Sequence, residues 1–338
     1  MTIHFAAIGI THDHINGMTQ MLLDEGAVLS SFHAEEDDLA ADYMKRFPQA
    51  RRVGDRRAIL EDGSIALVLT SAVPADRAAI SIAAMRAGKD VLSDKPGMIS
   101  LSQLDEVRRA QRETGRIFSV LYSEHFERKS VVRAGELVAA GAIGRVINVV
   151  GLGPHRLRPQ SRKPYFFDRA RYGGILTDIG SHQLEQFLFF TGATEVEVVS
   201  ATVANRAHPQ WPGLQDFGEL SLRAPGATGF VRVDWFTPDG LATWGDGRLF
   251  VLGTEGYIEL RKYVDIAGRP GDEHLFLVDG KGTRHIDCAD VVRPFGRQLI
   301  ADVLNRTETA MPQWRCYKAM ELAITAQTLA ERGTEWQQ

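Results

Sequence analysis

The sequence predicts an α/β protein in which a doubly wound parallel sheet is followed by an α+β domain with a large, mostly antiparallel open sheet. In the first third of the chain, short apolar runs alternate with helical patterns, which is typical of parallel strands joined by helical crossovers. After about residue 123, extended stretches are separated by turn signals such as Pro225-Gly226 and Asp239-Gly240, which favours antiparallel strands. We therefore expect two domains, residues 1–122 and 123–338.

The strands expected in the first domain are short and bounded by turn residues. They cover residues 3–10, 27–32, 65–70, 91–92 and 117–121. Ser100 and Gln103 have the spacing of a helix capping box, and Gly115 is a typical helix stop. Ligands of such sheets bind beyond the carboxyl ends of the strands. The loops at residues 9–14, 32–36, 70–74 and 93–97 should therefore surround one crevice.

The second domain is expected to mix helices with its extended stretches. Helices are expected over residues 128–140, 175–190, 293–306 and 314–332, and strands over residues 146–150, 196–203, 218–222, 230–236, 248–252 and 257–260. A polar loop containing Arg and Pro occupies residues 152–172. This order is typical of an antiparallel sheet with helices on one face.

Composition limits the classes of function. The 338 residues are 44% hydrophobic and 24% charged, which is ordinary for a globular protein of about two domains. The net charge of −4 provides no basic face for nucleic acid. Two cysteines without a CxxC motif suit a reducing compartment. Because no targeting segment or membrane-spanning stretch is visible, we expect a cytoplasmic protein without nucleic-acid or membrane partners.

The loop after the first strand resembles a dinucleotide fingerprint only in part. Of the three glycines in GxGxxG, only Gly9 is present, and Thr11 and His14 occupy the other two places. The following helix N-terminus could still bind an anion. His12 and His14 also suggest a metal, but further ligands are not close in sequence. Because loop packing and capping by Asp13 explain these residues, we predict no metal site.

An acidic run, residues 33–38, follows the second strand. If a dinucleotide binds, a carboxylate here could hold the ribose diol and repel a 2′-phosphate, and we choose Glu35 for this role. The run contains no Lys or Arg, so NAD is favoured over NADP. The alternative is that these acids only complement the dipole of the next helix.

Two further segments contain residues suited to proton transfer. Lys95 follows the fourth strand directly and could act as an acid or base or orient a substrate hydroxyl; the alternative is a surface lysine. Asp178 and His182 are four residues apart and share one face of a helix, with Glu185 one turn further on. A carboxylate and an imidazole placed in this way could bind a hydroxyl and move its proton. The alternative is a buried histidine that simply pairs with Asp178.

These segments also carry a family resemblance. The DKP triplet at residues 94–96 and the GGxLxDxGxHxxE pattern at residues 173–185, in this order, resemble the glucose–fructose oxidoreductase/inositol dehydrogenase/MocA family. The AGKDV, GAIGRV and GTEG segments at residues 87–91, 141–146 and 253–256 resemble further marks of the family. The resemblance covers essentially the whole chain. It implies a Rossmann domain, an open-sheet domain and NAD(P)-dependent oxidation or reduction of a CH–OH group in a sugar, cyclitol or related polyol.

The resemblance assigns catalytic roles to three residues. His182 would be the general base, Lys95 would lower the pKa of the reacting hydroxyl, and Asp178 would help to hold the substrate. Arg77 takes the place of a histidine of the family. The residues assigned to the cofactor are Gly9, Thr11, His12, His14, Glu35, Pro74 and Lys95.

The substrate and the assembly are less specified. Arg158 lies in a basic loop and could bind a carboxylate or phosphate of the substrate, and Tyr165 could line a sugar site; a solvated lid and core packing are the alternatives. The resemblance implies a homodimer or homotetramer formed through the open sheet. Because Thr11 and His14 replace glycines, a non-redox sugar-binding or regulatory descendant is the alternative function. A lyase or epimerase with a tightly bound NAD is a third hypothesis for the function.

Overall fold

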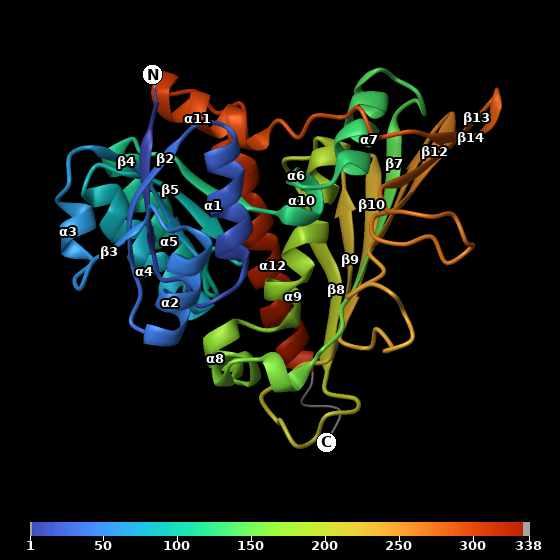
Figure 1. Ribbon diagram of the computed structural model, residues 1–338. Helices are drawn as coiled ribbons and strands as arrows, with labels where there is room; N and C mark the ends of the chain where they lie inside the picture. The colour runs from blue at the N-terminus through green and yellow to red at the C-terminus, as the bar shows by residue number, and fades with distance from the viewer. Residues whose placement is uncertain (1, 334–338) are drawn as a thin grey trace. The chain divides into compact units, whose positions relative to one another are not determined.

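The computed structural model describes residues 2–333, and its contacts divide the chain into two compact units (Figure 1). The first unit comprises Met1–Leu121, Arg171–Gly173 and Pro294–Tyr317, and the second comprises Tyr122–Ala170, Gly174–Arg293 and Lys318–Gln338. The sequence predicts a second domain of residues 123–338. Instead, the chain returns near its C-terminal end to complete the first unit.

The first unit is built on a six-stranded parallel sheet with the order β3-β2-β1-β4-β5-β6. Its strands are β1 (His4–Ile8), β2 (Val28–His33), β3 (Arg51–Arg52), β4 (Ile65–Thr70), β5 (Asp90–Asp94) and β6 (Phe118–Leu121). This confirms the doubly wound parallel sheet. The strand β3 was not expected, because two residues are too few to show a periodic pattern.

Helices join these strands, and their ends follow capping chemistry. They are α1 (His14–Asp24), α2 (Asp37–Arg46), α3 (Arg57–Leu60), α4 (Pro74–Arg86), α5 (Leu101–Thr114) and, from the C-terminal return, α11 (Phe295–Asn305). The Ser100 hydroxyl accepts a hydrogen bond from the Gln103 amide at 3.2 Å, which confirms the cap of α5. The Gln103 side chain accepts from the amide of Ile99 at 2.9 Å, so the box closes one residue earlier than expected.

The C-terminal return completes the sheet edge of the first unit. The Gln313 side chain accepts from the Phe118 amide at 3.1 Å and donates to the Phe118 carbonyl at 2.8 Å. Because β6 is an edge strand, this side chain satisfies backbone groups that no neighbouring strand pairs. The guanidinium of Arg306 also donates to both carboxylate oxygens of Asp90, at 2.7 and 3.0 Å.

The second unit is built on an eight-stranded sheet with the order β14-β13-β12-β11-β7-β10-β9-β8. Its strands are β7 (Val146–Pro154), β8 (Glu197–Ala204), β9 (Phe217–Ala224), β10 (Ala227–Asp234), β11 (Arg248–Gly253), β12 (Gly256–Arg261), β13 (His274–Asp279) and β14 (Gly282–Ile286). Within this second sheet, β7 and β10 form the only parallel pair among the described strands, which confirms the mostly antiparallel sheet. The hairpin β13–β14 was missed, because β14 is largely exposed and lacks an apolar face.

The helical elements of the second unit vary in length, and α8 is divided between the two units. They are α6 (Ser123–Phe126), α7 (Lys129–Ala139), the 3₁₀ turns η1 (Pro159–Ser161) and η2 (Pro164–Phe167), α8 (Arg169–Tyr172), α9 (Ile175–Asp178) and α10 (Gly180–Thr191). The helix α12 (Gln313–Gly333) begins in the first unit and continues into the second. The single helix expected over residues 175–190 is divided at Ile179.

Glycines let α10 lie close to the sheet. A Cβ atom at Gly151 or Gly153 on β7 would come within 2.7 Å of the Gln183 side chain, and one at Gly229 on β10 within 2.8 Å of Phe187. Real Cβ atoms do not approach so closely, so a larger residue at Gly151 or Gly229 would force the helix or the strand to shift, whereas at Gly153 the nearest atom is the Nε2 end of the flexible Gln183 side chain. The backbone of α10, which carries His182, is therefore fixed against the sheet.

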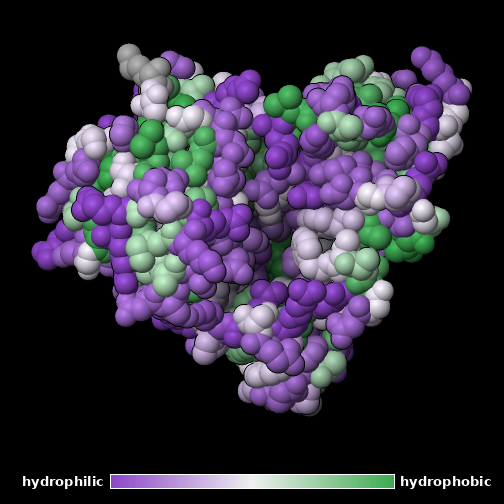
Figure 2. All heavy atoms as spheres, in the orientation of Figure 1, coloured by the Kyte–Doolittle hydropathy of each residue, from purple (hydrophilic) through white to green (hydrophobic). Residues whose placement is uncertain are grey.

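The surface drawn in Figure 2 is covered mostly by hydrophilic residues, with apolar residues in small groups. Between residues 2 and 333, no helix has both the length and the apolar character needed to cross a bilayer.

Candidate active site

The loop after β1 requires glycine at its first position. Gly9 has a φ of +74°, and a Cβ there would lie 2.5 Å from the Cβ of Ala72. The Gly9 amide donates to the His33 carbonyl at 3.1 Å, and its carbonyl accepts from the Ser71 amide at 2.9 Å. Gly9 is thus bonded to the segments that follow β2 and β4, at the carboxyl ends of the strands.

His12 has a role that the sequence did not indicate. Its backbone amide donates to the Ser71 carbonyl at 2.9 Å, and its ring Nδ1 accepts from the His14 amide at 3.2 Å. The His12 ring therefore caps α1. Asp13, the expected cap, makes no capping bond with its side chain. Burial and the neighbouring His14 hold the pKa of His12 well below its usual range, so this ring is neutral at pH 7.

Asp94, at the end of β5, is the centre of a buried cluster. Its carboxylate lies 2.8 Å from His14 Nδ1, accepts from the Ser71 hydroxyl at 3.0 Å, and accepts from the Arg77 guanidinium at 2.9 Å. Burial alone would raise the pKa of Asp94, but Arg77 and His14 hold it well below its usual range. Asp94 is therefore a carboxylate at neutral pH.

The same cluster brings together a set that could bind a metal. His12, His14 and Asp94 each offer a ligand atom, and these atoms lie within 4.8 Å of one another. The sequence did not reveal the third ligand, because Asp94 is 80 residues from His14. However, Arg77 already donates to this carboxylate, and a second cation beside a guanidinium is unfavourable. The hydrogen bonds among these groups account for the cluster without an ion.

Arg77 holds the backbone that carries Lys95. Its side chain is 1% exposed and donates to the carbonyls of Ala72 (2.7 Å), Lys95 (2.5 Å) and Pro96 (3.0 Å), in addition to Asp94. The Lys95–Pro96 peptide bond is cis. Lys95 itself is buried. A single guanidinium therefore ties the loops after β4 and β5 together beneath the predicted catalytic lysine.

The remaining residues predicted to bind the cofactor also lie in the first unit. Pro74 is the buried first residue of α4, Thr11 is half-buried in the β1 loop, and Glu35 is exposed just after β2. Arg52 on β3 donates to the Ala34 carbonyl at 3.0 Å and pairs with Asp37 at 2.7 Å. The acidic run contains no Lys or Arg of its own, but the fold brings Arg52 beside it.

Asp178 and His182 lie at the junction of α9 and α10 in the second unit. Both are buried, Asp178 at 8% exposed and His182 at 2%. The His182 amide donates to the Ile179 carbonyl at 3.1 Å, three residues back, so the regular helical ladder is interrupted here. The Tyr122 ring stands edge-on to His182 with the centroids 6.0 Å apart. Lys95 belongs to the first unit and these two residues to the second.

A buried polar network surrounds the first turn of α10, and the sequence does not predict it. Glu124 accepts from Lys262 Nζ at 2.8 Å and from Gln183 Nε2 at 3.0 Å. Lys262 also donates to Gln186, whose amide donates to the His182 carbonyl at 2.9 Å. Glu124 and Lys262 are 138 residues apart, so no local pattern could have paired them. Glu185 instead lies 2.8 Å from His125.

The basic loop is held mainly by structural contacts. Arg156 donates to the carbonyls of Pro238 and Leu241, and the Arg162 guanidinium stacks over Phe166 at 4.3 Å. Arg158 is exposed, with a φ of 45°, and Tyr165 is half-buried. Of the two residues in this loop that were predicted to bind substrate, Arg158 is exposed and positively charged, and Tyr165 is less exposed.

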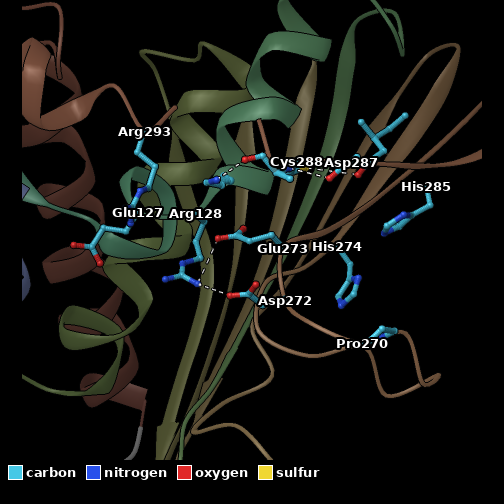
Figure 3. Close-up of a pocket in the computed structure, with 13 residues that line it drawn as sticks. Glu127, Arg128, Pro270, Asp272, Glu273, His274, His285, Asp287, Cys288 and Arg293 are labelled. Atoms are coloured by element: carbon cyan, nitrogen blue, oxygen red, sulfur yellow. Dashed lines mark hydrogen bonds and ion pairs between the residues drawn. The ribbon is translucent and has the colours of Figure 1, made fainter. Parts of the chain in front are cut away.

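A separate polar pocket of about 500 Å³ lies wholly in the second unit (Figure 3). Arg128 points toward Glu273 and Asp272, at 3.5 and 3.8 Å. Glu273 also accepts from the Ser130 amide and hydroxyl, at 3.0 and 2.6 Å. None of the predicted site residues lines this pocket. Its charges largely pair with one another, so we assign it no role in the reaction.

Comparison with known proteins adds family information. Residues 131–259 match the profile of the GFO/IDH/MocA C-terminal domain. A crystal structure of an oxidoreductase from Erwinia carotovora atroseptica is 46% identical and superimposes with a TM-score of 0.95, covering 97% of this chain and 99% of that one.

Curated relatives are more distant. The uncharacterized oxidoreductase YdgJ of Escherichia coli is 29% identical over 50% of this chain and 46% of its own length. The scyllo-inositol 2-dehydrogenase (NADP(+)) IolW of Bacillus subtilis is 23% identical over 60% of this chain and 54% of its own. The chain thus spans about half the length of these curated relatives.

Proposed function

Because this chain belongs to the GFO/IDH/MocA family of oxidoreductases, we propose that it is an NAD(P)-dependent dehydrogenase. Its substrate is a sugar, cyclitol or related polyol, and hydride transfer takes place at a CH–OH carbon. The name of IolW, a scyllo-inositol dehydrogenase, supports this substrate class. The observation that carries the proposal is the pair of buried groups on α9 and α10, Asp178 and His182, in a chain that also offers Lys95 after β5.

The first unit fits a dinucleotide. In the order β3-β2-β1-β4-β5-β6, β2 and β3 are added on one side of β1 and β4, β5 and β6 on the other, so the strand order reverses between β1 and β4, where such sheets bind their ligands. Gly9 lies at this point and has the positive φ and close approach expected of the first fingerprint glycine. Gly9, Thr11, His12, His14 and Pro74 would hold the pyrophosphate and nicotinamide portions. A bound nicotinamide ring supplies the hydride acceptor or donor.

The proposed reaction moves one proton and one hydride. In the oxidation direction, the His182 imidazole takes the proton of the substrate hydroxyl while the hydride leaves its carbon and a carbonyl forms. The Lys95 ammonium donates a hydrogen bond to the same oxygen and stabilises the charge that develops there. Asp178 accepts hydrogen bonds from substrate hydroxyls.

We propose NAD as the preferred cofactor. The exposed Glu35 carboxylate after β2 supports a ribose diol contact and disfavours a 2′-phosphate. Arg52 is the opposing consideration, because an arginine in this place can accept a phosphate. Its guanidinium already pairs with Asp37 at 2.7 Å, which leaves it less free for a ligand.

The substrate contacts and assembly are also proposals. Arg158 and Tyr165 would contact the substrate, and Arg158 would favour one bearing a carboxylate or phosphate. A homodimer or homotetramer would form through the open sheet face, where Leu252 on β11 and Tyr257 on β12 are exposed and paired in register. We retain the cytoplasm as its location.

One observation favours the second candidate, a non-redox sugar-binding or regulatory protein. The His12 ring accepts the His14 amide at 3.2 Å, so one of the first N–H groups of α1 is already satisfied before any pyrophosphate arrives. This candidate keeps sugar binding in the second unit but lacks cofactor affinity.

The test is a dehydrogenase assay with NAD or NADP across a panel of cyclitols, aldoses and sugar acids. Lys95→Ala and His182→Ala should each lower kcat/KM by at least about 100-fold, the usual contribution of a positioned acid or base. Matched controls are Lys281→Ala and His285→Ala, which remove the same side chains from exposed positions on the β13–β14 hairpin. A parent activity that survives both site substitutions unchanged would contradict the assignment.

A further inference from the structure

We propose that Glu124 and Lys262 form a buried ion pair that positions His182 and tunes its proton affinity. This inference rests on the proposed function, in which His182 accepts the substrate proton. Neither residue belongs to the motifs that carry the family resemblance. Both act through α10 rather than on the substrate, so they are positioning residues.

The geometry links the pair to His182 by hydrogen bonds. Lys262 Nζ donates to Glu124 at 2.8 Å and to Gln186 Oε1 at 2.8 Å, and Gln186 Nε2 donates to the His182 carbonyl at 2.9 Å. On the other side, Gln183 Nε2 donates to Glu124 at 3.0 Å. The pair is therefore hydrogen-bonded to Gln183, the residue after His182, and to Gln186, one turn after His182. It restrains the turn of α10 from which the imidazole projects.

Burying this ion pair costs free energy, because both charges lose their hydration. Glu124 is 2% exposed and Lys262 is 1% exposed. Desolvation of two charges offsets much of their mutual attraction, so such a pair adds little stability compared with an apolar pair of similar volume. Glu124 Oε1 has no hydrogen-bond partner within the described part of the chain. An ion pair in this place is better explained by what its field does than by the stability it provides.

The field acts on His182. Burial alone would raise the pKa of Glu124, but Lys262, His182 and His155 lower it to about 2. Glu124 is therefore a carboxylate throughout the working pH range. Because electrostatic interaction is reciprocal, the carboxylate that a protonated His182 stabilises also stabilises the protonated His182.

The other groups around this site set the balance. Lys262 opposes the effect of Glu124, but its ammonium is held by Gln186, one turn beyond the Glu124–Gln183 contact. Burial and then Glu124 hold the pKa of Tyr263 well above its usual range, so that its hydroxyl is neutral. Asp178 is the last residue of α9, and Tyr122 lies between β6 and α6. Among these groups, Glu124 carries a negative charge, and its ion pair with Lys262 holds that charge beside α10. The carboxylate stabilises the His182 imidazolium that forms when the ring accepts the substrate proton.

The test is a direct NMR titration of the His182 ring in the full-length protein without substrate, with His182→Gln used to assign the signal. Glu124→Gln should lower the His182 midpoint by about one pH unit, within the range for losing one nearby opposite charge. The substitution is nearly isosteric, and its new amide can donate to Gln183 Oε1, which has no partner among the residues described. An unchanged midpoint in a folded variant would overturn the proposal.

Two further variants keep the test decisive. Glu124→Gln combined with Lys262→Met leaves no unpaired buried charge, so it provides a folded variant if the single substitution fails. Its His182 midpoint should also lie below that of the parent. Asp216→Asn is the matched control, because it removes a buried carboxylate that pairs with His208 at 2.8 Å elsewhere in the same unit. It should leave the midpoint unchanged.

The kinetic readout separates the inference from the proposed function. If the parent is a dehydrogenase, the acidic limb of its kcat/KM profile should move to lower pH in Glu124→Gln by the same amount as the NMR midpoint. If the parent shows no turnover with any substrate and cofactor, the proposed function fails. The NMR titration still decides whether Glu124 tunes His182.

Discussion

The loop that carries Lys95 is held by two buried residues, Asp94 directly before it and Arg77 on α4. The lysine was identified from its position after a strand, but Arg77 and Asp94, which hold its loop, were recognised only as motif positions. Arg77 makes bonds to the carbonyls on both sides of the cis peptide and to Asp94. Arg77 therefore holds the loop that carries Lys95 through hydrogen bonds to its backbone carbonyls and to Asp94.

Asp94→Asn should be strongly destabilising above pH 5. It leaves the Arg77 guanidinium buried without its counter-charge, which typically lowers the free energy of unfolding by about 3–5 kcal/mol. The folded-state pKa of Asp94 is depressed, so its contribution is complete above the unfolded pKa of about 3.9 and declines as pH falls below that value. The difference in free energy of unfolding between the parent and Asp94→Asn should therefore become smaller at acidic pH.

Urea unfolding of both proteins between pH 3 and pH 7 measures this gap. The control is Asp55→Asn, which removes an exposed carboxylate paired with Arg57 and should have a much smaller effect. A gap that stays constant across the range would mean that the Asp94 charge is not what stabilises the loop.

The helix carrying His182 shows how far a sequence pattern reaches at the scale of an element. The periodicity of residues 175–190 correctly predicted a helix, but its division at Ile179 was not visible, because Asp178 and Gly180 are both compatible with either arrangement. The two-residue β3 and the polar β14 were missed for a related reason. Elements defined by pairing with a distant strand lack an apolar signal of their own.

Gly151→Ala should push α10 away from β7. The new methyl group would lie 2.7 Å from Gln183 Cγ, so the helix or the strand must shift, at a cost of about 1–3 kcal/mol in the free energy of unfolding. Gln183 also contacts Glu124, and kcat/KM should fall as well. Thermal and urea unfolding measure the first effect and the dehydrogenase assay the second.

Gly240→Ala is the control for this substitution. Its added methyl group meets no heavy atom within 4 Å, and its φ lies outside the left-handed region. If both variants unfold at the same denaturant concentration, the close approach of α10 to the sheet does not limit stability.

At the scale of the molecule, the sequence predicts the two sheets, but it does not predict which segments of the chain belong to which unit. Alternating strands and helices predicted the parallel sheet, and turn-separated strands predicted the antiparallel one. The return of Pro294–Tyr317 to the first unit depends on contacts such as Gln313 with Phe118, which join residues 195 positions apart. The Glu124–Lys262 pair was hidden in the same way, because pattern reasoning detects periodicity along the chain and not side chains that meet in the fold.

The central claim, that the protein uses a nicotinamide dinucleotide, is tested most directly by calorimetric titration with NAD and, separately, with NADP. The purified protein is first checked by its ultraviolet spectrum for cofactor retained through purification. We predict that NAD binds at one site per chain, more tightly than NADP. Glu35→Ala should reduce the difference between the Kd values for NAD and NADP. Binding of neither dinucleotide, with no retained cofactor, would contradict the account and favour a sugar-binding protein in which the His12 cap of α1 has displaced the pyrophosphate.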